Sequence, residues 1–207
     1  FLTGKSIARY FTWDGMRAID YLLTRPEIDP ARIGVTGLSG GGTQSSYIGA
    51  MDDRVCAAAP TGFITSISRL LGSIGPQDAE QVFYHGPRRG IDHADLLEVR
   101  APRPTLQVTT TRDFFSIQGA RETEAEVQRA FRAFGMPNHF ARVEDDYHHG
   151  FTRANNEATY EFFQRSLDLP GDPTEHEYPY LTEEELTVTD TGPISTSFPG
   201  ETVFSLY

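Results

Sequence analysis

The chain has 207 residues, a length that holds one domain with a substantial hydrophobic core. Its formal net charge of −11 argues against nucleic acid or an anionic membrane as a partner, because both require a basic face. No apolar run of the sequence approaches the roughly 20 residues of a membrane-spanning helix. The single cysteine, Cys56, excludes an intrachain disulfide and lies in an apolar run, so we expect a buried, unreactive thiol.

The first part of the chain alternates between the periodicities of helices and strands. Apolar residues at helical spacing, among them Trp13, Met16 and Ile19, predict an amphipathic helix, and prolines break the chain after it. A short β-branched run then predicts a buried strand. The predicted elements are a helix over 8–23, a strand over 32–37, a helix over 40–50 and a strand over 55–60.

The rest of the chain continues this alternation after a long insertion. Residues 61–99 show no strand period, which is typical of a lid or a substrate-facing cap. Strands are predicted over 105–111 and 140–143, and helices around 127–134 and over 155–167. In the first of these helices Val127, Ala130, Phe131 and Phe134 are expected to share one face, and Gly135 to end it. The alternation predicts an α/β fold with a parallel sheet and helices on both faces.

Both ends of the chain are expected to be truncations or boundaries. The chain begins with Phe1, without a signal segment, and stops at Tyr207 in an apolar, strand-like phrase. From Pro170 onward Pro, Thr, Glu and Gly dominate, with strand-like pieces over 186–188 and 202–206. We therefore expect a domain over 1–169 and a C-terminal extension over 170–207.

The phrase Gly37-Leu38-Ser39-Gly40-Gly41 fits the pattern G-x-S-x-G between a predicted strand and a predicted helix. A serine nucleophile on so sharp a turn needs neighbours without bulk, which Gly37 and Gly41 supply. The N–H of Gly40, at the start of the helix, is then the expected oxyanion donor. The alternative is a phosphate-binding glycine turn, but the chain lacks the G-x-G-x-x-G form and the phosphate-loop lysine.

Ser39 requires a base and an acid that orients this base, in the chain order serine, acid, histidine. Asp113 follows the predicted strand 105–111 and is the expected acid. Its rivals lie just before the histidine pair, and we interpret them as a solvated acidic turn. These rivals are Glu144, Asp145 and Asp146.

His149 is the expected base, because it follows the predicted strand 140–143 and precedes Gly150, which lets the loop bend the ring toward the serine. Its neighbour His148 is the alternative, since two adjacent side chains cannot both face the serine. The other histidines are expected at the surface or in the cap. These are His85, His93, His139 and His176.

Acidic residues and histidines gather in the expected cap, namely Asp78, Glu80, His85, Asp92, His93 and Asp95. Their spacing matches no tight ligand motif such as H-E-x-x-H, and a polar cap facing a sugar explains them as well. We therefore expect no metal and no other cofactor. Asp78, Glu80 and Arg112 are secondary candidates for contacts with the substrate.

A set of phrases gives the chain a distinctive signature, including R-P-E-I-D-P-A-R-I-G directly before the elbow, A-P-R-P-T-L, T-R-D-F-F and H-G-F. Over about 14–167 the chain resembles α/β-hydrolases of the acetyl xylan esterase-like kind, relatives of the cephalosporin-C deacetylase and prolyl oligopeptidase groups. The resemblance implies the C-terminal part of an α/β-hydrolase fold with a cap insertion. It also implies Ser39, Asp113 and His149 as the triad.

The same resemblance implies cleavage of esters on plant cell-wall carbohydrates, commonly the removal of O-acetyl groups, by proteins that are often secreted or periplasmic. Members have several strands, and the loop with a second oxyanion donor, before the helix that begins here near Ala8. We therefore expect this sheet to lack one edge. We also expect the oxyanion hole to lack one donor, a loss typically worth about 10² to 10³ in rate.

The leading expectation is a serine carbohydrate esterase without a nucleic-acid or membrane partner. One alternative is a methyl esterase of pectin-like uronates, for which Arg112 or the pair Arg88-Arg89 could bind a neighbouring carboxylate. A serine peptidase is a further alternative. The alternative outside the enzymes is a catalytically inactive hydrolase-like module that binds glycans.

Overall fold

The computed structural model describes residues 5–74, 77–198, 200–202 and 205. It divides the chain into two compact units between Glu175 and His176. Glu175 belongs with the first unit through its contacts, because its backbone oxygen accepts a hydrogen bond from Arg153 Nη2 and its carboxylate accepts one from Asn156. The first unit therefore extends beyond residue 169, where the sequence predicts the change to an extension.

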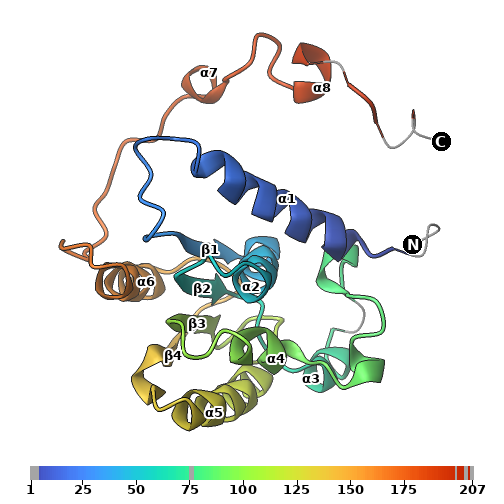
Figure 1. Ribbon diagram of the computed structural model, residues 1–207, viewed down its shortest axis with the longest axis vertical. Coiled ribbons are helices and arrows are strands. Elements are labelled where there is room, and N and C mark those ends of the chain that lie inside the picture. The colour runs from blue at the N-terminus through green and yellow to red at the C-terminus, as the bar shows by residue number, and fades with distance from the viewer. Residues whose placement is uncertain (1–4, 75–76, 199, 203–204, 206–207) are drawn as a thin grey trace. The chain divides into compact units, whose positions relative to one another are not determined.

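A four-stranded parallel sheet forms the centre of the first unit, in the order β1-β2-β3-β4 (Figure 1). The strands are β1 (Gly34–Leu38), β2 (Ala57–Thr61), β3 (Thr105–Thr110) and β4 (Phe140–Asp145). Strand order follows chain order, so each connection crosses over one face of the sheet with a helix. All strands consequently have their carboxyl ends at the same edge, which confirms the predicted α/β class.

Helices cover both faces of the sheet (Figure 1). On one face, buried residues of β2 and β3 pack against Phe162 of α6. On the other face, Ala58 packs with Ile19 and Ile48, which lie on α1 and α2. The helices are α1 (Ile7–Leu22), α2 (Gly40–Met51), α4 (His93–Glu98), α5 (Ile117–Ala133) and α6 (Arg153–Ser166).

Capping residues set the ends of these helices. Ser6, Ser116 and Thr152 begin α1, α5 and α6, each accepting a hydrogen bond from a backbone N–H of the first turn. Gly135, with φ of +74°, follows the end of α5 in the left-handed conformation that favours glycine. Phe134, expected to share one face with Val127 and Phe131, is 60% exposed, whereas those two side chains are fully buried.

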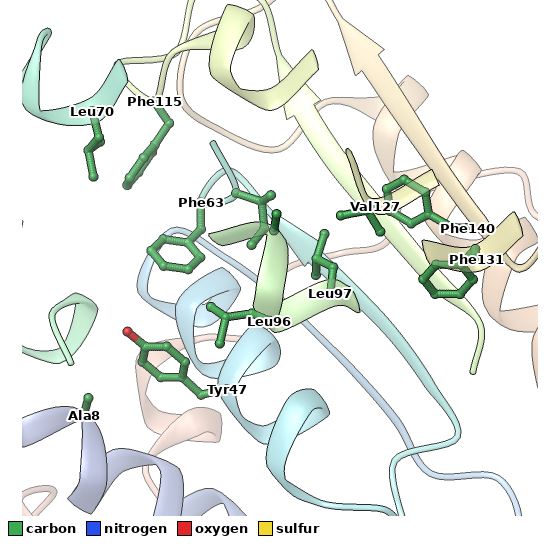
Figure 2. Close-up of a cluster of buried hydrophobic side chains, with 12 residues drawn as sticks. Ala8, Tyr47, Phe63, Leu70, Leu96, Leu97, Phe115, Val127, Phe131 and Phe140 are labelled. Atoms are coloured by element: carbon green, nitrogen blue, oxygen red, sulfur yellow. The ribbon is translucent and has the colours of Figure 1, made fainter. Parts of the chain in front are cut away.

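The predicted cap contains part of the core and several short helices. These helices are α3 (Ile67–Leu71), η1 (Ala79–Gln81), η2 (Pro87–Arg89) and α4. Leu96 and Leu97 of α4 are buried in one cluster with Phe63 of the loop after β2 and Val127 of α5 (Figure 2). Ile64 and Leu70 belong to the same cluster, so both the first and the last part of the insertion contribute to the core.

Two further expectations need correction. Cys56 is half-buried and its Sγ lies 3.2 Å from Ala31 O, so the thiol is not fully enclosed. In the second unit, residues 186–188 form no strand, because Leu186 ends a short helix, α7 (Glu183–Leu186), that begins with a capping box at Thr182. Another short helix, α8 (Ile194–Ser197), follows it, and much of the strand predicted over 202–206 lies outside the described residues. None of the helices formed by described residues is long and apolar enough to cross a membrane.

Candidate active site

Ser39 lies on the sharp turn between β1 and α2, at the carboxyl edge of the sheet. Its φ of 60° and ψ of −114° lie in a region that side chains rarely adopt, and such strain costs on the order of 1–3 kcal/mol. Two backbone hydrogen bonds fix the turn, from Ser39 N to Thr61 O at 3.0 Å and from Thr43 N to Ser39 O at 2.8 Å. The strained backbone of Ser39 is the geometry expected of a nucleophile elbow.

Glycines around Ser39 allow the turn to close. A Cβ on Gly37 would lie 2.8 Å from the backbone of Gly41, and a Cβ on Gly42 would lie 2.3 Å from Thr61 O. A Cβ on Gly41 would contact nothing within 4 Å. The turn therefore excludes side chains at Gly37 and Gly42. Sequence reasoning missed Gly42, although the run of three glycines contained the signal.

Gly40 begins α2, so its N–H is among the first N–H groups of the helix, which have no intrahelical partner. The first turn of α2 contains no acidic residue, and no side chain caps its N-terminus. Nothing within the helix therefore neutralises the positive end of its dipole. Glu80 of η1 approaches it instead, with Oε1 lying 3.8 Å from the position of a Cβ on Gly40. Gln81, the next residue, anchors η1 by donating a hydrogen bond to Thr43 Oγ1 at 3.3 Å.

Asp113 and His149 form a close pair on the loops that follow β3 and β4. His149 Nδ1 lies 2.8 Å from Asp113 Oδ2 and 2.9 Å from Oδ1. The Asp113 side chain is only 3% exposed and accepts further hydrogen bonds from Phe115 N at 2.9 Å and Thr110 Oγ1 at 3.3 Å. This buried, fully oriented carboxylate can fix the imidazole so that Nε2 is free to accept a proton.

Gly62 connects this pair with the elbow. It has φ of +58°, and a Cβ on it would lie 3.2 Å from His149 Cε1 and 2.8 Å from Leu38 Cδ1. The residue before it, Thr61, accepts the hydrogen bond from Ser39 N. The imidazole therefore lies over a glycine that directly follows the backbone partner of Ser39. Sequence reasoning missed Gly62, and no local pattern distinguishes it from an ordinary turn glycine.

Phe114 is a second residue that sequence reasoning missed. Its ring stacks on the imidazole of His149, with centroids 4.2 Å apart and planes inclined by 37°. The ring centroid of Phe115 lies 5.8 Å from that of the imidazole. Phe114 is 46% exposed, so it forms part of the surface beside the histidine. The phrase T-R-D-F-F contained this signal.

The rival carboxylates are engaged elsewhere. Glu144 pairs with Arg121 and Arg142, which keeps the pKa of its carboxyl below the ordinary value, mainly through the hydrogen bond from Arg121. Asp146 pairs with Arg112 and accepts a hydrogen bond from Thr111. The remaining rival, Asp145, accepts a hydrogen bond from the backbone N–H of the next residue. Of the acidic candidates, the structure brings only Asp113 to His149 among the described residues.

The secondary candidates lie in different surroundings. Arg112 is half-exposed and donates to the backbone oxygen of Asp146 as well as pairing with its carboxylate. Asp78 is exposed before η1, whereas Glu80 lies beside Gly40 as described. Arg88 and Arg89 are exposed on η2. Among these charged residues, only Glu80 is placed next to the elbow.

His93 was wrongly predicted as a surface residue or a residue facing substrate from the cap. It is 2% exposed in the core, and its Nδ1 accepts a hydrogen bond from Thr65 N at 3.2 Å. Burial lowers its pKa from 6.5 to about 4, although the Asp92 carboxylate opposes this shift. His148 and His85 are exposed, and His139 contacts Pro102 O. No group of three His, Cys, Asp or Glu side chains within the described residues is placed to hold a metal ion.

Comparisons with known proteins agree with the fold of this chain. No family model matches the chain. "Putative hydrolase YtaP" of Bacillus subtilis (strain 168) is 24% identical over 175 residues, which cover 80% of this chain and 56% of that protein. The chain thus spans little more than half the length of this relative.

Solved structures show the same fold. "Methylesterase BT1017" has a TM-score of 0.62 and is 26% identical, covering 79% of this chain and 36% of its own. A family 15 glucuronoyl esterase from Caldicellulosiruptor kristjansonii has a TM-score of 0.68 at 18% identity, covering 84% of this chain and 55% of its own. The chain has the α/β-hydrolase fold, of which it spans a part.

Proposed function

From the α/β-hydrolase fold and the arrangement at the carboxyl edge of its sheet, we propose that this chain carries the catalytic triad of a serine ester hydrolase that acts on esterified carbohydrates. Ser39 is the nucleophile, His149 the base and Asp113 the acid that orients it. The observation that carries the proposal is the pair formed by His149 Nδ1 and the buried Asp113 carboxylate, and a serine in a strained turn at the same edge of the sheet supports it. The relatives support the reaction class, because their names describe a hydrolase and carbohydrate esterases.

In the proposed reaction, Ser39 Oγ attacks the carbonyl carbon of the ester while His149 Nε2 takes the hydroxyl proton. The imidazolium then donates this proton to the leaving alkoxide, which leaves an acyl-enzyme. Water hydrolyses the acyl-enzyme by the same route. Asp113 stabilises the imidazolium, and the Gly40 N–H, at the positive end of α2, stabilises the oxyanion.

The substrate proposed first is an O-acetylated cell-wall polysaccharide, to which the resemblance of the sequence points. The sugar hydroxyl is then the leaving group, and acetate leaves from the acyl-enzyme. No side chain beside Ser39 has to bind a charge for this reaction.

An ester of a uronic acid is the second candidate, and the comparisons favour it. The names of the similar structures describe a methylesterase and glucuronoyl esterases, and one glucuronoyl esterase was solved with methyl 4-O-methyl-β-D-glucopyranuronate. In such a reaction the sugar stays on the acyl side and the alcohol, such as methanol, leaves. Arg112, which the sequence suggests for this role, is half-exposed but already paired with Asp146.

The test is intact-mass analysis of the full chain after treatment with a fluorophosphonate. We expect one adduct, lost in Ser39→Ala and retained in Ser68→Ala, a change at an exposed serine of α3. Release of acetate from acetylated xylan and of methanol from methyl-esterified uronate would then distinguish the two substrates. A folded chain that forms no adduct but binds these glycans would replace the esterase by the glycan-binding alternative, and cleavage of peptides alone would replace it by a peptidase.

A further inference from the structure

A cavity separate from the proposed triad lies between α1, α2 and the segment 83–96. Its volume is about 880 Å³, within the range of small-molecule sites. Neither Ser39, Asp113 nor His149 lines it. Its wall is mainly apolar and aromatic, and includes Tyr10, Trp13, Tyr47, Phe83, Tyr84 and Leu96.

Tyr47 contributes a buried polar group to the wall of this cavity. The side chain is 4% exposed, and within the described residues its hydroxyl has no hydrogen-bond partner. In Figure 2 this hydroxyl points away from Leu96 and Leu97, although the ring packs in the same cluster. An unpaired buried hydroxyl is unfavourable, and a ligand with an acceptor atom would remove this cost.

Two other hydroxyls in the wall are already engaged. Ser6 Oγ donates to Val82 O at 2.8 Å, and Thr12 Oγ1 donates to Ala8 O at 2.7 Å. Most of the wall is apolar, which suits a sugar, with its many hydroxyl groups, poorly. An aromatic ring matches the wall better, because Trp13, Phe83 and Tyr84 offer ring faces and edges at which rings pack favourably.

The charge near Tyr47 defines the ligand further. Burial raises the pKa of the Tyr47 hydroxyl above its ordinary value, and the Glu80 carboxylate raises it as well. The hydroxyl therefore stays protonated and acts as a donor at neutral pH. Lys5 and Arg9 also line the cavity and would attract an anion, but the Glu80 carboxylate opposes one at the Tyr47 hydroxyl itself, so a neutral acceptor oxygen suits this position better than a carboxylate.

We propose that this cavity is a binding site for a small neutral aromatic molecule that carries an acceptor oxygen, such as a carbonyl or an ether. The ring packs among the aromatic residues of α1 and of segment 83–96, and the oxygen accepts a hydrogen bond from Tyr47. The proposal is independent of the triad, because none of its residues contacts the proposed ligand. It is therefore testable in a chain that lacks the nucleophile.

The experiment uses the full chain with Ser39→Ala and two probes of similar shape, acetophenone and ethylbenzene, of which only acetophenone has an acceptor oxygen. Trp13 is the single tryptophan of the chain and lines the cavity, so its indole N–H signal in a ¹H–¹⁵N spectrum reports binding directly. We expect a saturable shift with both probes. Tyr47→Phe should lower the affinity for acetophenone about five- to tenfold and leave the affinity for ethylbenzene unchanged.

Tyr21→Phe is the matched control, because Tyr21 is 63% exposed on α1 and does not line the cavity. This variant should bind both probes as the parent chain does. The proposal is overturned if neither probe shifts the Trp13 signal saturably, or if Tyr47→Phe weakens both probes equally. Xylotriose that shifts the same signal at lower concentration than acetophenone would replace the aromatic ligand by a glycan.

Discussion

Lowering the pH from 8 to 5 should destabilise this protein through His93. The folded pKa of about 4 lies below the ordinary value of 6.5, so the unfolded chain binds more protons between these values. The stability that the buried, neutral His93 contributes is therefore fully present above pH 6.5 and is lost as the pH falls toward 4. The two pKa values give a loss of roughly 2 kcal/mol between pH 8 and pH 5, and roughly 3 kcal/mol when protonation is complete.

Thermal unfolding followed by circular dichroism at pH 8, 6.5 and 5 measures this loss, and roughly 2 kcal/mol corresponds to a fall in Tm of about 4–8 °C for a chain of this size. The protein also loses stability in acid when paired carboxylates such as Asp52 become protonated. The contribution of His93 is therefore measured with His93→Gln, whose amide oxygen can accept the hydrogen bond from Thr65 N. This variant should lose about 2 kcal/mol less between pH 8 and 5 than the parent. His176→Gln, at an exposed histidine of the second unit, is the control. Identical pH profiles of His93→Gln and the parent would refute the reasoning.

Three further predictions concern the triad, the elbow and the core. Asp113→Asn should lower kcat about 10⁴-fold in an ester-hydrolysis assay, because the amide favours the wrong imidazole tautomer, while Asp145→Asn should retain activity. Gly42→Ala should prevent closure of the elbow, since its Cβ would lie 2.3 Å from Thr61 O, whereas Gly41→Ala should keep the native circular dichroism spectrum. Phe131→Ala should lower the free energy of unfolding in urea by about 3–5 kcal/mol, because this side chain of α5 is fully buried and its ring packs against Phe140.

The sequence was sufficient to predict the four strands and the helices α1, α2 and α6, but only the last part of α5 and none of the short helices of the insertion. Short apolar runs bounded by glycine and proline placed the strands, and the elbow pattern placed Ser39 between β1 and α2. Asp113 was selected because it follows the predicted strand 105–111, and the structure brings it to His149. The catalytic roles of these residues stay predictions until the elbow is tested.

Contacts between distant segments explain what the sequence did not reveal. The burial of His93 depends on Phe63, whose ring lies 4.5 Å from the imidazole although the two are far apart in the chain. The exposure of Phe134 follows from the end of α5, where helical periodicity no longer determines the direction of a side chain. In the second unit, Thr182 and Glu185 form a capping box that outweighs the β-propensity of the residues that follow.

The loop after β2 links the strain of the elbow to the position of the base. Thr61 accepts the hydrogen bond from Ser39 N and approaches Gly42 closely, so it helps hold the backbone conformation of the serine. Gly62, directly after it, leaves the space that the His149 ring occupies. Since the proposed nucleophile and base lie on different loops, their relative position depends on a shared support, and these two residues provide it. A Cβ on Gly62 would lie 3.2 Å from His149 Cε1 and 3.4 Å from His149 Nδ1, the atom that bonds Asp113, so the alignment of the imidazole and its hydrogen bond to Asp113 depend on the same glycine.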